Sequence, residues 1–136
     1  MKRPYKDLIE RLKEAGLRPT RQRLALAKLL FGPTNRHLTA EQLHAEALAA
    51  GVRVSLATVY NSLHQFTSAR LLREVVVEPG RSYFDTNIED HHHFFHEDSG
   101  SLQDIPKDQL RIASLPEAPA GTAISRVDVT IRLTKD

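Results

Sequence analysis

The chain has 136 residues and a formal net charge of +2, and its lack of cysteine excludes disulfides, thiolate zinc sites and thiol catalysis. No apolar run approaches the roughly 18 residues of a membrane-spanning helix, so we expect a cytoplasmic protein without a membrane partner. The charge is divided unevenly: residues 1–84 hold 14 Lys/Arg against 7 Asp/Glu, a balance of +7, and residues 85–136 hold 5 against 10, a balance of −5, which suggests that the basic part contacts a polyanion.

Four segments in the first part of the chain carry apolar residues at helical spacing. They predict helices over residues 5–15, 21–31, 40–51 and 56–69. The expected N-caps of the last three are Thr20, Thr39 and Ser55. Thr39 with Gln42 three residues later forms a capping box. The expected core residues of the third helix are Leu43, Ala47 and Leu48.

Strand patterns follow these helices. Residues 71–78 and 82–86 are rich in β-formers and flank a Pro-Gly-Arg turn, so they predict a hairpin. Short helices followed by a hairpin indicate a winged helix over residues 1–85, and residues 86–90 have the character of a hinge. Beyond it we expect a strand pair at 91–97 and 101–105, a short helix at 107–115, a loop at 116–121 and a strand at 123–134.

The expected fourth helix has a polar face without any charged residue. Its apolar face consists of Leu56, Val59, Leu63 and Phe66, and its polar face of Thr58, Asn61, Gln65 and Ser68, with Ala57 and Tyr60 at the margins. Amide and hydroxyl groups pair with base edges in the major groove of DNA, whereas a merely solvated face usually carries Glu and Lys. The segment is therefore a candidate DNA-reading helix. Three arginines near the start of the second helix are candidate phosphate or minor-groove contacts: Arg18, Arg21 and Arg23.

The stretch EDHHHFFHED gathers His91, His92, His93 and His96 within six positions. In a strand, side chains alternate between faces, so His91 and His93 point one way and His92 the other. Two imidazoles with carboxylates suit Fe(II), Mn(II) or Zn(II), and mixed nitrogen and oxygen donors favour iron or manganese when thiolates are absent. The cluster is therefore a candidate site for a metal or a metal-carrying cofactor.

The chain resembles the ferric uptake regulator superfamily in four stretches. These are LKEAGLRPTRQRLAL, HLTAEQLHAEA, VSLATVYNSLHQFTSARLL and HHH, with SLATVY, the recognition helix of that family, as the most specific motif. Within the superfamily, SYFDTNIEDHHHFF with a cysteine-free tail is similar to the iron response regulator of alphaproteobacteria. The resemblance implies an α+β homodimeric transcription factor, with a winged-helix DNA-binding domain over 1–85 and an α/β dimerisation and sensing domain over 91–136.

The resemblance also implies roles for single residues. Tyr60 would contact a thymine in the major groove and Arg18 would enter the minor groove. The full set of candidate DNA contacts is Arg18, Thr58, Tyr60, Asn61 and Gln65. The regulatory metal would be bound by His37, Asp85, His91, His93 and Asp104. The structural zinc of the family, bound by two CxxC pairs, has no counterpart in a chain without cysteine.

We expect a regulator of iron and haem genes that binds a double-stranded DNA operator under iron limitation. Haem, free or brought by a haem-delivering protein, would release it by binding His91, His92 and His93, with Phe94 and Phe95 as apolar surface. In the alternative, a divalent metal promotes DNA binding and haem is irrelevant. A third alternative is a non-haem iron enzyme with two histidines and one carboxylate. Because the chain shows no second catalytic constellation, we expect no enzyme.

Overall fold

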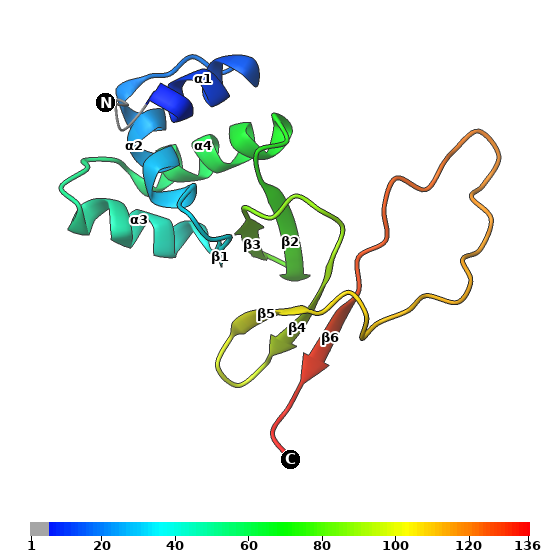
Figure 1. The fold of residues 1–136 in the computed structure, drawn as a ribbon. Coiled ribbons are helices and arrows are strands. Elements are labelled where there is room, and N and C mark those ends of the chain that lie inside the picture. The colour runs from blue at the N-terminus through cyan, green and yellow to red at the C-terminus, as the bar shows by residue number, and fades with distance from the viewer. Residues whose placement is uncertain (1–5) are drawn as a thin grey trace. The chain divides into compact units, whose positions relative to one another are not determined.

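The computed structural model describes residues 6–136, so Tyr5, where the first predicted helix begins, lies outside the described residues. The chain divides into two compact units, the first ending at Ile88 and the second running from Glu89 to Asp136. Figure 1 shows the elements of each unit. None of the helices in the described residues is long and apolar enough to span a bilayer.

The first unit contains the four predicted helices. They are α1 (Lys6–Glu14), α2 (Arg21–Leu30), α3 (Ala40–Ala49) and α4 (Leu56–Ser68). The predicted caps are confirmed: the Thr20 hydroxyl accepts from the Arg23 N–H at 3.2 Å, and Thr39 and Gln42 form the reciprocal capping box. Each cap satisfies backbone N–H groups that have no partner within the helix.

The core of this unit lies where α2, α3 and α4 meet. Its fully buried side chains include Ala27, Leu30, Leu43, Ala47, Val59, Leu63 and Phe66. The prediction for Leu48 is wrong, since 53% of it is exposed. Five residues of helix turn a side chain by about 140°, so Leu48 points away from the face that Leu43 and Ala47 bury.

The predicted hairpin consists of β2 (Arg73–Glu78) and β3 (Arg81–Asp85). A two-residue strand that the sequence did not reveal, β1 (His37–Leu38), pairs antiparallel with the other edge of β3. Leu38 lies opposite Phe84, and both are 1% exposed, which anchors the sheet in the helical core. Two residues are too short to display a period, so only the folded chain reveals β1. The four helices together with this three-stranded sheet of β1, β3 and β2 form a winged helix.

The second unit is built on three strands. These are β4 (His92–His96), β5 (Ser101–Ile105) and β6 (Thr130–Leu133), in the order β5-β4-β6. The strands β4 and β5 are antiparallel, with His93 opposite Asp104, whereas β6 runs parallel to β4. The loop predicted at 116–121 is confirmed and belongs to a longer irregular segment, drawn in orange in Figure 1.

Two predictions for the second unit are wrong. Residues 107–115 form a turn and irregular chain instead of a helix. Their apolar residues Ile112 and Leu115 are 39% and 51% exposed, and a helix of nine residues without a buried face is not stable in water. The last strand begins at Thr130 and not at 123, because β4 offers pairing partners only for residues 130–133.

Candidate metal centre and nucleic-acid interface

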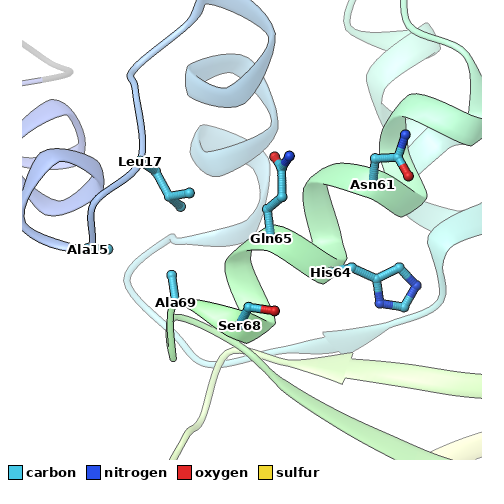
Figure 2. Close-up of a pocket in the computed structure, with 7 residues that line it drawn as sticks. All are labelled: Ala15, Leu17, Asn61, His64, Gln65, Ser68 and Ala69. Carbon is cyan, nitrogen blue, oxygen red and sulfur yellow. The ribbon is translucent and has the colours of Figure 1, made fainter.

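The exposed face of α4 carries the side chains expected to read DNA. Asn61, Gln65 and Ser68 are exposed, as are Ala57 and Tyr60. The helix contains no charged residue. A shallow hollow lies over this face, and Figure 2 shows the side chains that line it: Ala15, Leu17, Asn61, His64, Gln65, Ser68 and Ala69. Such a surface can exchange hydrogen bonds with base edges without repelling phosphates.

Thr58, another DNA candidate, makes its hydrogen bonds within α4 and its cap. It is half-buried, its N–H donates to Ser55 Oγ at 3.1 Å, and its hydroxyl accepts from the Ser55 hydroxyl at 2.9 Å. The side chain therefore completes the N-cap of α4.

Tyr60 is held by a neighbouring helix. Its hydroxyl donates to Glu41 Oε1 of α3 at 2.7 Å, and its ring stacks on His64 with 6.3 Å between centroids. This hydrogen bond raises the pKa of Tyr60 and lowers the pKa of Glu41, because it favours the protonated phenol and the ionised carboxylate together. Sequence reasoning missed Glu41, since it lies 19 positions away on a helix with no DNA signature.

Arg23 joins the start of α2 to α4. Its Nε and Nη2 both donate to Gln65 Oε1, at 3.2 and 2.9 Å, and its Nη1 donates to the Arg18 carbonyl oxygen at 3.0 Å. The Arg18 side chain itself is exposed. The sequence marked Arg23 only as a candidate phosphate or minor-groove contact, and no local pattern reveals its pairing with a residue 42 positions away.

The second unit brings two histidines and a carboxylate together. His91 and His93 are 7% and 4% exposed, and their Nε2 atoms lie 3.6 and 3.3 Å from Asp104 Oδ1. The possible ligand atoms of these three residues all lie within 4.8 Å of one another. The register of β4 against β5 creates this group, because it sets His93 directly opposite Asp104. Two imidazoles and a carboxylate fit a divalent first-row metal.

Hydrogen bonds assign the proton positions of His91 and His92. His91 Nδ1 lies 2.5 Å from the Glu89 carbonyl oxygen, which can only accept, so in the neutral ring Nδ1 carries the proton and Nε2 has its lone pair on the Asp104 side. A carbonyl behind the ring is the usual way in which a metal-binding histidine is oriented. His92 Nδ1 instead accepts from the Val129 N–H at 3.0 Å, so in the neutral ring Nε2 carries the proton. In their neutral forms, His91 therefore has a lone pair on Nε2, whereas His92 has a proton there.

The remaining metal candidates, His37 and Asp85, lie in the first unit. They are register partners across β1 and β3. Asp85 is 1% exposed and accepts from the Asn87 N–H at 2.9 Å, and the His37 ring lies edge-on to Tyr83 with 6.3 Å between centroids. Of the candidate ligands, His37 and Asp85 thus belong to the first unit, and His91, His93 and Asp104 belong to the second.

Comparison with known proteins relates both units to one family. Residues 14–132 match the ferric uptake regulator family. The ferric uptake regulation proteins of Shigella flexneri and Escherichia coli K12 are 36% and 35% identical over 100 residues, which cover 73% of this chain and 68% of each relative. The crystal structure of the Vibrio cholerae ferric uptake regulator is similar with a TM-score of 0.75 and 28% identity, covering 95% of this chain and all of that one. The manganese-containing ferric uptake regulator of Pseudomonas aeruginosa has a TM-score of 0.69 and 25% identity, with 93% and 96% covered.

Proposed function

Because the chain belongs to the ferric uptake regulator family, whose members are transcription regulators and not enzymes, we propose that it is a homodimer that binds its DNA operator when a divalent metal is bound. It is a metal-dependent regulator of iron homeostasis with an α+β fold, an N-terminal DNA-binding domain and a C-terminal dimerisation domain. The observation that carries the proposal is the group formed by His91, His93 and Asp104.

The proposed DNA surface is the exposed face of α4 with the residues around it. Its contacts are Arg18, Thr58, Tyr60, Asn61 and Gln65. An uncharged polar helix face beside exposed arginine supports this assignment, since the amides can address bases while the arginine attracts phosphate. The relatives named above are bacterial, so we expect this DNA-binding protein in the cytoplasm, where bacterial DNA lies.

The proposed metal ligands are His91, His93 and Asp104, with His37 and Asp85 added on the strength of the family resemblance. Iron or manganese suits these nitrogen and oxygen donors, and a bound metal supplies positive charge at the buried imidazoles. If ligands come from both units, metal binding favours one domain arrangement over others, which is how it can promote binding to two half-sites.

A second copy of the chain is the proposed partner of the second unit. Three apolar side chains on its irregular segment are exposed, at 39%, 51% and 47%: Ile112, Leu115 and Ile124. Covering such residues is favourable by about 25 cal/mol per Å² of apolar surface. The exposed apolar surface therefore supports dimerisation through this unit.

A divalent metal is favoured over haem by the burial of the histidines. Haem iron binds an axial imidazole through the lone pair of one ring nitrogen, on the open face of a flat macrocycle. His91 and His93 are almost fully buried, and His92 in its neutral form carries the proton on Nε2. Phe95, expected to supply apolar surface, is 2% exposed. Release by haem, and the closer kinship with iron response regulators suggested by SYFDTNIEDHHHFF, stay predictions of the sequence.

Titration with Mn(II) tests the site. His93→Ala should weaken Mn(II) binding by at least about tenfold, the lower range for removing groups around a metal, and should raise the Mn(II) concentration needed for operator binding by a similar factor. His92→Ala is the matched control on the same strand and should leave both quantities unchanged. Calorimetry and gel-shift titration measure them.

Two outcomes would contradict the proposal. Equal loss of Mn(II) affinity in His92→Ala would place the metal elsewhere. DNA binding that is strong in a chelator and abolished by haemin, with a Soret band that the His91→Ala/His92→Ala/His93→Ala triple variant lacks, would make haem the effector and the sequence prediction correct.

A further inference from the structure

The Arg23 guanidinium and the Gln65 amide form a contact that the proposed function does not use. Arg23 Nε and Nη2 both donate to one atom, Gln65 Oε1, at 3.2 and 2.9 Å. The third, to the Arg18 carbonyl oxygen at 3.0 Å, holds the guanidinium from the other side. The Arg23 backbone is fixed as well, because its N–H donates to the Thr20 cap.

This contact determines which way the Gln65 amide faces. Guanidinium groups only donate, so the atom that receives two of their N–H groups must be the amide oxygen and not the nitrogen. An amide oxygen has two lone pairs, and both are occupied by Arg23. The group that Gln65 can still offer to a ligand is therefore its –NH2, a pure donor.

Gln65 stands where a DNA base would meet it under the proposed function. It is exposed, lies one helical turn from Asn61 on α4 and lines the hollow over that face, as Figure 2 shows. A glutamine with both amide atoms available pairs with adenine, accepting from N6 and donating to N7. A glutamine that can only donate is matched best by guanine, whose N7 and O6 both accept, whereas adenine N7 and thymine O4 each offer one acceptor and the N4 donor of cytosine is mismatched.

We propose that Gln65 is a specificity-determining residue that selects guanine at one position of each half-site, and that Arg23 is the positioning residue that gives the amide this polarity. The inference rests on the proposed DNA binding through α4. It assigns Arg23 a role through Gln65, in contrast to the direct phosphate contact that its charge alone would suggest.

The test is selection from a pool of randomised DNA duplexes with Mn(II) present, followed by affinity measurements on single-base variants of the selected operator. Gln65→Ala should lose the guanine preference at one position per half-site, by about tenfold, the scale of one good side-chain-to-base pair. Arg23→Ala should shift that same position from guanine toward adenine by a similar factor, because the amide oxygen becomes available to accept. The double variant should behave like Gln65→Ala alone.

Arg21→Ala is the matched control, since it removes an arginine from the same helix turn without touching Gln65. It should weaken binding to all sequences alike and change no base preference. Loss of the Arg23 side chain leaves the Thr20 cap intact, so the variant should fold, and its circular dichroism should match that of the wild type.

Several outcomes would overturn the inference. One is an Arg23→Ala variant that loses affinity uniformly, as Arg21→Ala does, which would make Arg23 a phosphate contact. Another is a preference shift that persists in the Gln65→Ala background, which would mean that Arg23 acts on the base itself. Failure of the wild type to select any sequence would instead refute DNA binding, and both proposals would fall together.

Discussion

Two adjacent histidines of the same strand region have opposite chemistry because of the backbone atoms beside them. In the neutral rings, His91 faces a carbonyl oxygen and has a lone pair on Nε2, whereas His92 faces an N–H group and has a proton on Nε2. Alternation along a strand predicts that the two point to different faces, and the burial of His91 with His93 agrees with it. The proton positions depend on Glu89 and Val129, which no spacing rule connects to the histidines.

The contact between Tyr60 and Glu41 gives a prediction at this scale. The hydrogen bond from Tyr60 is the largest cause of the lowered pKa of Glu41. Tyr60→Phe should therefore raise the pKa of Glu41 toward its ordinary value, as measured by NMR titration of the side-chain carboxyl carbon. Because the folded pKa of Glu41 is lowered, its stabilising contribution is present above the unfolded pKa of about 4.5 and is lost as pH falls through the folded value.

Tyr83→Phe is the control for this titration. It removes a phenol from β3 that is not the Glu41 partner, so the pKa of Glu41 should stay lowered. The same curve for wild type and Tyr60→Phe would show that the hydrogen bond does not persist in solution.

Elements were predictable where local chemistry specifies them. Caps at Thr20, Thr39 and Ser55 identified where α2, α3 and α4 begin, because the capping side chain and its target lie within three residues. Elements were not predictable where a strand that is distant in the sequence determines whether a segment pairs. The short β1 exists because β3 offers it an edge, and the chain before β6 lacks the neighbour that would extend the strand.

The capping box of α3 gives a prediction at the element scale. Thr39→Ala removes the hydroxyl oxygen that accepts from the Gln42 N–H at 3.2 Å and so breaks one half of the box. The free energy of unfolding should fall by about 1 kcal/mol. Urea unfolding followed by circular dichroism measures it. Ser68→Ala, on the exposed face of α4 and outside any cap, should change stability by less than about 0.5 kcal/mol, and an equal loss in both variants would contradict the role of the box.

At the scale of the whole molecule, the charge division corresponds to a division of tasks. The basic first unit carries the proposed DNA surface, and the acidic second unit carries the His91, His93 and Asp104 group. The sequence predicted this assignment from charge and motifs together. Fold class followed from helices succeeded by strands, whereas the arrangement of ligands within each unit required strand register.

A regulator of this kind must obey reciprocity between its two sites. If Mn(II) raises operator affinity by some factor, the operator must raise Mn(II) affinity by the same factor. Calorimetric titration of Mn(II) with and without operator DNA, beside gel shifts with and without Mn(II), should give equal ratios, typically 5- to 150-fold for coupled sites. The contrary result is that Mn(II) raises operator affinity strongly while the operator leaves Mn(II) affinity unchanged. That result would show that the metal does not act by equilibrium binding to the DNA-competent state.

The irregular segment over residues 106–129 also determines the order in which the second unit folds. The turn at 97–100, with Gly100 at a left-handed φ of 70°, lets β4 and β5 pair after closing about four residues, whereas β6 must close about 24. Loop-closure entropy makes the longer connection costlier by about 1.6 kcal/mol. We therefore expect His93 and Asp104 to meet early, in a hairpin, and β6 to dock late and open first, which amide hydrogen exchange can follow strand by strand. In that order the chain would bring its proposed metal ligands together before it completes the sheet that holds them.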